Sequence, residues 1–145
     1  MTKKSSGFIP SYVIASVDKS SLDEKALENL KGICRAKESL FKKAFKTDNL
    51  NIEETEDKYI FPWFYQEELG DLEAYTLFIE KICALAKSLK RVNPKEDKAV
   101  ENEKYAFRCF LLRIGLIGDQ YKAARKVLLR NLSGSAAFKS GAKSS

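Results

Sequence analysis

The last third of the chain, from Glu101 to Gly141, sets the strongest constraint on the fold. Its apolar stretch YAFRCFLLRIG predicts a helix over about 97–115, and a helix that is apolar on nearly every side belongs at the centre of a domain. Gly115 and Gly118 mark a joint, after which Asp119 is expected to be the N-cap of a helix over about 119–132. A buried helix that leads into a charged one is typical of a protein that presents a binding surface.

Two amphipathic helices are predicted earlier in the chain. Ser21 and Glu24 form a capping box, and apolar residues then recur on one face as far as Phe45. This pattern predicts one long helix that ends near Lys46. A second helix is predicted over about 71–91, where apolar residues again recur at helical spacing.

Short β-branched and aromatic segments predict a small sheet. Tyr12 to Val17 has the composition of a strand. A hairpin is expected from Leu50 to Ile52 and from Tyr59 to Phe61, with Pro62 ending the second strand. The expected fold class is therefore α+β, with four helices, one long and amphipathic and one central and buried, and a sheet of two to three strands.

Length and hydropathy indicate a single domain over residues 1–145, with loose polar ends at about 1–7 and 139–145. No segment reaches the roughly 18 apolar residues of a membrane span, and the N-terminus has no apolar core of a secretory signal. We therefore expect a cytoplasmic protein without a membrane partner.

The absence of histidine removes the commonest general base and the commonest metal ligand. The three cysteines are far apart and lie beside the apolar faces of predicted helices, so we expect them to be buried and unreactive. We expect no enzyme activity, no metal site and no cofactor. If the chain were an enzyme, its chemistry would depend on carboxylates such as Glu101 and Glu103.

Basic residues concentrate at the C-terminus. From Asp119 onward there are six basic residues and one acidic residue, and three of the basic ones recur at helical spacing. A basic helix with a basic tail can follow a phosphate backbone, although a solvated helix face has the same pattern. The expected nucleic-acid-binding residues are Lys122, Arg125, Lys126, Arg130 and Lys139.

Acidic residues concentrate between Glu53 and Glu73, a segment that contains eight carboxylates and one lysine. Such a surface can dock on a protein by charge complementarity. In this alternative the interacting residues are Glu53, Glu54, Glu56, Asp57, Glu67 and Glu68. The aromatic string within this segment, Phe61 to Tyr65, is expected to belong to the core.

Two cations fall on apolar sides of predicted helices. Lys37 lies in the apolar arc of the first helix, and Arg113 lies opposite the polar stripe of the third. A buried cation needs a partner or a route to solvent. We expect both to be structural and either to extend their charged ends to solvent or to pair with a carboxylate, with Arg113 paired to a carboxylate from another element. The alternative is that the two cations line a pocket for an anion.

A set of residues in the segment from about Ser21 to Gly141 forms a distinctive pattern: Ala36, Lys37, Leu40, Lys42 to Ala44, Phe61 to Phe64, Asn102 to Arg113, Gly115, Ile117, Gly118, Tyr121, Lys122, Arg125, Lys126, Leu128, Leu129, Asn131, Leu132, Gly134, Phe138, Lys139 and Gly141. Through these residues the segment resembles an uncharacterised Firmicutes family of "virulence-related" proteins, found on conjugative transposons and prophages. In many members the matching region is the C-terminal domain of a longer protein.

The resemblance implies a mobile genetic element but no catalytic residues. Accessory proteins of such elements commonly handle DNA or block host defences. We therefore expect a non-enzymatic protein that binds nucleic acid or a nucleoprotein through its basic C-terminal helix. The alternative is an anti-CRISPR-like inhibitor that docks on a host defence nuclease.

Overall fold

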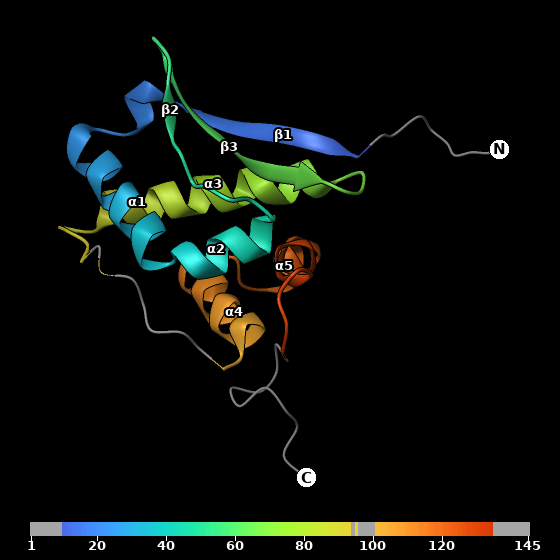
Figure 1. Cartoon of the computed structure of the whole chain (residues 1–145). Helices are drawn as coiled ribbons and strands as arrows, with labels where there is room; N and C mark the ends of the chain where they lie inside the picture. Colours follow the sequence, from blue (N-terminus) through green and yellow to red (C-terminus); the bar gives the residue numbers. More distant parts are fainter. Residues whose placement is uncertain (1–9, 94, 96–100, 135–145) are drawn as a thin grey trace.

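The computed structural model, which describes residues 10–93, 95 and 101–134, contains a three-stranded antiparallel sheet in the order β1-β3-β2 (Figure 1). The strands are β1 (Ser11–Asp18), β2 (Glu53–Glu54) and β3 (Lys58–Gln66). The first strand and the hairpin lie close to where the side-chain pattern predicts them. The expected α+β class with a small sheet is confirmed.

Pro62 lies inside β3, so the prediction that it ends the strand is wrong. The register between β1 and β3 shifts between Val13 and Ala15, which places Pro62 and Trp63 together opposite Ile14. Two residues facing one form a β-bulge, and a bulge interrupts the ladder of hydrogen bonds. A proline, which has no N–H to donate, is tolerated at such a position.

The described residues form five α-helices, so the expected number of four is wrong. Two single-turn 3-10 helices lead into α1 and α5. The bounds are η2 (Lys19–Ser21), α1 (Glu24–Ala36), α2 (Glu38–Phe45), α3 (Asp71–Ser88), α4 (Glu103–Arg113), η3 (Asp119–Tyr121) and α5 (Lys122–Leu129).

The predicted long helix is broken at Lys37, whose φ of −104° and ψ of 18° are not helical. Buried residues continue at helical spacing on both sides of the break, so the apolar pattern contains no sign of it. The start of the helix also differs from the prediction. Asp23, not Ser21, accepts a hydrogen bond from the N–H of Ala26 at 2.7 Å.

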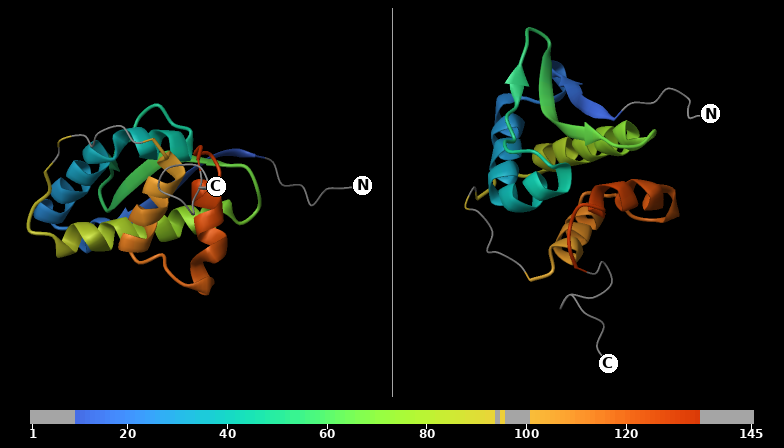
Figure 2. Two further views of the ribbon diagram at one scale, coloured as in Figure 1. Left: turned by 90° about the horizontal axis from the view of Figure 1, so that it is seen from below. Right: turned by 45° about the vertical axis from the view of Figure 1, so that its right-hand side comes forward.

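The central helix of the fold is α3, whereas we had expected α4 to be central. Eight residues of α3 are buried, and the sheet lies over this helix, while α4 and α5 lie on the side away from the sheet (Figure 2). Only Phe107, Phe110 and Leu111 of α4 are buried, and Cys109 and Arg113 are exposed. The apolar sequence of α4 therefore belongs to a helix at the edge of the molecule, and this helix buries only one of its sides.

The turn between α4 and α5 follows the glycines that predicted it. Gly115 has a φ of 105°, and the N–H groups of Gly115 and Leu116 bond the carbonyls of Leu112 and Leu111. This is a Schellman motif, which requires the left-handed conformation that glycine adopts without strain. Asp119 begins η3 and makes no side-chain cap, so its predicted role as the N-cap is wrong.

Aromatic rings fill the centre of the core. Phe41 has no exposed surface and lies 5.4 to 6.5 Å, between ring centroids, from five other rings. These separations are typical of favourable aromatic pairs. The five rings come from α2, β3, α3 and α4, so this one side chain joins most of the fold: Phe45, Trp63, Phe78, Phe107 and Phe110.

Candidate binding surfaces

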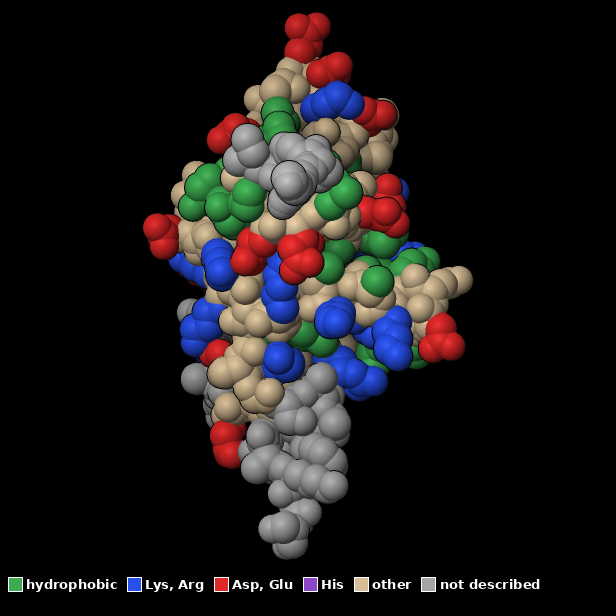
Figure 3. Space-filling view, turned by 90° about the vertical axis from the view of Figure 1, so that its right-hand side faces the viewer, with side chains coloured by type: hydrophobic (Ala, Val, Ile, Leu, Met, Phe, Trp, Pro, Cys, Tyr) green, Lys and Arg blue, Asp and Glu red, His purple; other side chains and the backbone are tan. Residues whose placement is uncertain are grey.

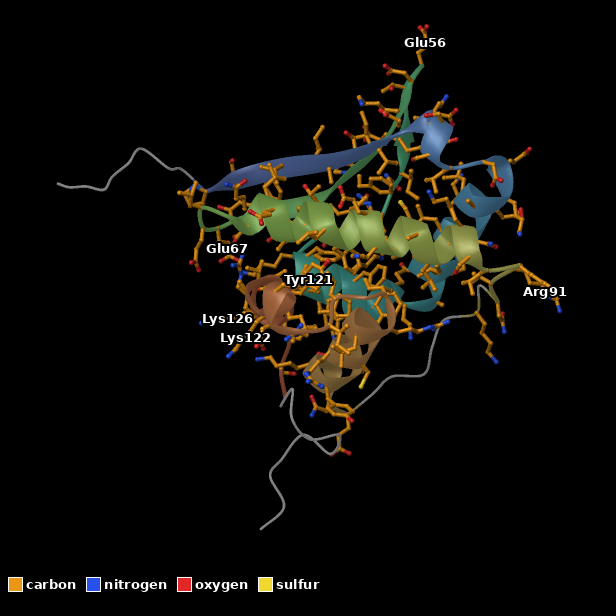
Figure 4. The ribbon with its side chains drawn as sticks, turned by 180° about the vertical axis from the view of Figure 1, so that it is seen from behind. Glu56, Glu67, Arg91, Tyr121, Lys122 and Lys126 are labelled. Atoms are coloured by element: carbon orange, nitrogen blue, oxygen red, sulfur yellow. The ribbon has the colours of Figure 1, made fainter. Side chains whose placement is uncertain are left out.

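The exposed part of α5 carries Lys122 and Lys126. Both side chains are exposed, and Figure 4 shows them one turn apart at the same end of the molecule. In Figure 3, lysine and arginine side chains gather on the lower half of this face, and a pair of carboxylates lies above them. The two lysines are in no ion pair with the residues that the structure describes.

Arg125, which we expected to bind nucleic acid, holds the turn before its own helix. Its Nη1 donates to the carbonyl oxygens of Leu116 and Gly118, each at 2.9 Å. The side chain is half-buried in this position. Arg125 therefore fixes α5 against the end of α4.

Arg130 forms a bidentate ion pair with Asp71. Its Nη1 and Nη2 donate to the two carboxylate oxygens of Asp71 at 3.0 and 2.6 Å, and Nη2 also lies 3.3 Å from the Tyr75 hydroxyl. Glu67 adds a second carboxylate at 3.3 Å. The Arg130 side chain is 21% exposed, so most of its charge faces these groups instead of solvent.

Asp71 is 1% exposed and begins α3. Burial alone would raise the pKa of its carboxyl group, but hydrogen bonds from Arg130 and from the N–H groups of Glu68 and Glu67 outweigh burial and hold this pKa below its usual value. The same bond to Asp71 raises the pKa of Arg130. Burial raises the pKa of Tyr75, whose hydroxyl donates to Tyr65, to about 12.

The predicted acidic surface is divided in space. Glu53, Glu54, Glu56 and Asp57 lie at the β2–β3 turn, whereas Glu67 and Glu68 follow the other end of β3, and Figure 4 shows Glu56 and Glu67 at opposite ends of the molecule. A strand of nine residues is about 30 Å long. The acidic segment therefore forms two surfaces, of which the second borders α5.

Lys46 is a further cation near α5 that sequence reasoning did not single out. Its Nζ lies 3.6 Å from Glu67, and its side chain is 53% exposed. Because Glu67 also contacts Arg130, Lys46 lies at the C-terminal end of α5. It is the one non-glycine residue of the described chain with positive φ, 56°, which no feature of the sequence predicts.

Arg113 differs from our expectation of a buried cation that is paired with a carboxylate. Arg113 is exposed, and it is in no ion pair with the described residues. Lys37 is half-buried, with its Nζ 5.6 Å from the centroid of the Phe110 ring. Both cations line one cavity of about 260 Å³ between α1, α3 and α4.

The cysteines and the aromatic string are mostly buried, as expected. Burial raises the pKa of the Cys34 thiol, and it raises that of Cys83 to about 12, so neither is a thiolate at neutral pH. Cys109 is exposed, which corrects our prediction for this residue. Trp63 is 1% exposed and donates from Nε1 to the carbonyl of Asn51 at 2.7 Å, so it belongs to the core.

Within residues 10–93, 95 and 101–134, no helix is long and apolar enough to cross a membrane. Across the same residues, no group of three or more acidic or cysteine side chains is arranged to hold a metal ion. Lys139 and the expected loose ends lie outside the described residues.

Comparison of the chain with protein-family models, with curated proteins and with solved structures found no match. The resemblance to the mobile-element family therefore stays a prediction. The candidate surfaces are assigned from geometry alone.

Asp71→Asn should destabilise the protein by about 3 kcal/mol at pH 7, because it leaves the half-buried Arg130 without its main counter-charge. The folded-state pKa of Asp71 lies below the unfolded value of about 3.9, so its carboxylate stabilises the fold above that pH and this contribution is lost as the pH falls through the folded value. The stability difference between wild type and variant, measured by urea unfolding, should therefore shrink below about pH 4.

The matched control is Asp48→Asn at an exposed position, which should change stability by less than about 0.5 kcal/mol. A constant difference between wild type and Asp71→Asn from neutral pH to about pH 2 would show that the charge of Asp71 does not stabilise the fold.

Proposed function

We propose that the chain is a non-enzymatic binding protein that contacts nucleic acid through α5. The observation that carries this proposal is the pair of exposed lysines, Lys122 and Lys126, on a helix that Arg125 and Arg130 hold in place. Residues four apart on a helix are neighbours, with about 6 Å between their Cβ atoms. The pair can therefore contact neighbouring phosphates of one strand.

The contact surface differs from the one that the sequence alone suggests. Arg125 and Arg130 stabilise the fold and are not part of the proposed contact surface, because Arg125 donates its hydrogen bonds to backbone carbonyls and Arg130 donates to Asp71. Lys46 adds a further cation at the C-terminal end of α5, beyond the pair formed by Lys122 and Lys126. The proposed contacts are thus few, and binding through phosphates alone is weak and strongly dependent on salt.

Glu67 and Glu68 border this surface and shape what it can bind. Their carboxylates lie 3.3 and 3.9 Å from Arg130, and the Glu68 side chain is 77% exposed. Carboxylates repel phosphates, so a nucleic acid would lie along Lys122 and Lys126 and away from the β3–α3 turn.

Lys122→Glu/Lys126→Glu should lower the affinity for single- or double-stranded DNA at least tenfold at about 50 mM salt. Each phosphate contact contributes about 0.9 to the slope of log affinity against log salt on duplex DNA, so the slope should fall by about two. Fluorescence anisotropy across a salt series, repeated with RNA, measures both quantities.

The control is Lys25→Glu/Lys87→Glu, which makes the same change of charge at two exposed lysines where α1 meets the far end of α3. It should retain most of the affinity. No binding by the wild type at about 50 mM salt, or an equal loss in both variants, contradicts the proposal.

A second function is favoured by the shape of the β2–β3 hairpin. Its turn projects from the body of the molecule (Figure 1) and carries Glu53, Glu54, Glu56 and Asp57, all exposed. Of these, Glu54 pairs with Lys19 at 2.5 Å. A projecting acidic turn fits a basic channel, such as the nucleic-acid channel of a host defence nuclease, by charge complementarity.

Glu56→Lys/Asp57→Lys should abolish capture of such a nuclease in a pull-down with purified Cas nucleases and restriction enzymes, because it reverses the charge at the tip. The variant should fold normally, since both residues are exposed. It should also leave DNA binding through α5 unweakened. Capture that survives this variant, but not Lys122→Glu/Lys126→Glu, would assign the protein contact to α5 instead.

A further inference from the structure

A third lysine lies beside the two exposed lysines of α5, although it belongs to α3. The Nζ of Lys81 is 5.3 Å from the centroid of the Tyr121 ring, which is a cation–π distance, and a Cβ added at Gly115 would lie 3.9 Å from the same Nζ. Lys81 is half-buried and is in no ion pair with the described residues. Because Lys122 follows Tyr121 directly in the chain, the basic surface of α5 continues onto α3 (Figure 4).

An apolar side chain is held beside these cations. Ile117 is 61% exposed. Both of its neighbours in the chain are fixed, because Arg125 donates to the carbonyl oxygens of Leu116 and Gly118. Arg125 and Lys122 are three residues apart and therefore adjacent on the helix surface, so Ile117 lies next to the lysines. Single exposed apolar side chains are common, but this one is fixed in position beside cations and a tyrosine ring.

Unpaired nucleotides carry both features that this surface presents a contact for. Each one has a charged phosphate and a base with two flat faces. In a duplex the faces are stacked on one another, and a protein reaches mainly phosphates, sugars and base edges. Proteins that bind single strands combine cations with side chains on which bases stack. Lysines interleaved with Ile117 and Tyr121 therefore fit a single strand better than a duplex.

Carboxylates border the surface at both ends of the lysine row. Glu67 and Glu68 lie at the C-terminal end of α5, and the exposed Asp119 begins η3 before its N-terminal end. A helix of eight residues is about 12 Å long, which is about the width of one major groove of a duplex. A duplex on α5 would thus bring the phosphates of its second strand close to these carboxylates. One strand can contact the lysines alone.

This surface lies at the end of α4 where the chain turns into η3. The last described residues lie against the opposite end of α4, where the N–H of Lys104 donates to the carbonyl of Ser133 at 3.0 Å. A helix of eleven residues is about 16 Å long. The contact formed by Lys81, Ile117 and Tyr121 is therefore separate from the point where the described chain ends.

We propose that the nucleic acid bound by α5 is single-stranded. Its phosphates contact Lys122 and Lys126 of α5 and Lys81 of α3. Its bases contact Ile117 and Tyr121. This inference rests on the proposed function and adds to it the form of the nucleic acid and two contact residues outside α5, one on α3 and one in the turn before η3.

Three oligonucleotides of about 12 nucleotides separate the contributions of phosphates and bases. They are a mixed-sequence single strand, the same strand in a duplex, and a strand of abasic sites, which keeps the phosphates and lacks the bases. Fluorescence anisotropy with the full chain at about 50 mM salt measures each affinity. The single strand should bind about tenfold more tightly than the duplex and than the abasic strand, because only it offers unstacked bases.

Ile117→Ser should weaken binding of the single strand about fivefold, because it removes an apolar contact. It should leave the salt slope unchanged, since no charge is altered, and it should not affect the abasic strand. Lys81→Gln should instead lower the slope on the single strand by about 0.7. The matched control is Ile14→Ser, which makes the same change at a 54% exposed position on β1 and should alter neither quantity.

Equal or tighter binding of the duplex overturns this inference and leaves the proposed function intact. The same holds for an unchanged affinity of Ile117→Ser for the single strand, or for an equal loss on the abasic strand, since either result removes the contact with bases. No binding of any of the three oligonucleotides by the wild type overturns the proposed function and this inference with it.

Discussion

The ion pair between Arg130 and Asp71 is the interaction on which the arrangement of the helices depends. It joins residues 59 positions apart, at the end of the last helix and at the start of the central one. Asp71 also accepts hydrogen bonds from the N–H groups of Glu67 and Glu68, so the same carboxylate fixes the turn between β3 and α3. Both charges are largely removed from water, so each depends on the other for compensation. Both carboxylate oxygens of Asp71 accept hydrogen bonds from Arg130, whereas the buried Nε of Arg130 has no hydrogen-bond partner among the described residues.

The position of α5 follows from this pair and from the bonds of Arg125 to the preceding turn. Two of the helix's cations face inward and fix it, and Lys122 and Lys126 face solvent. The proposed contact with nucleic acid therefore depends on a surface whose orientation is set by residues that do not take part in binding.

Local patterns predicted the fold class, the first strand, the hairpin and the burial of the aromatic string, because side-chain period and composition act within one element. They did not predict the break at Lys37, since apolar residues keep the same spacing in a bent helix as in a straight one. They also misplaced α4. An apolar helix sequence shows that burial is favourable but not how many neighbours the helix meets, which depends on the packing of distant elements.

For the candidate sites, too, the sequence predicts which residues are neighbours along one helix or strand, but not which distant residues meet in the fold. Sequence spacing placed Arg130 in a basic row with Lys122 and Lys126, but only the structure shows that its charge is paired with Asp71. Acidic residues that are neighbours in sequence are separated in space, because β3 carries Glu56 and Glu67 to opposite ends. Conversely, Lys37 and Arg113 are distant in sequence and line one cavity.

A double-mutant cycle of Asp71→Ala and Arg130→Ala, measured by urea unfolding, tests the central claim most directly. If the pair fixes α5 to α3, the two substitutions should be strongly coupled, with an interaction free energy of about 2 kcal/mol or more. If the two losses of stability add, with a coupling below about 0.5 kcal/mol, then Arg130 is not committed to the fold, and the account of α5 given above is wrong.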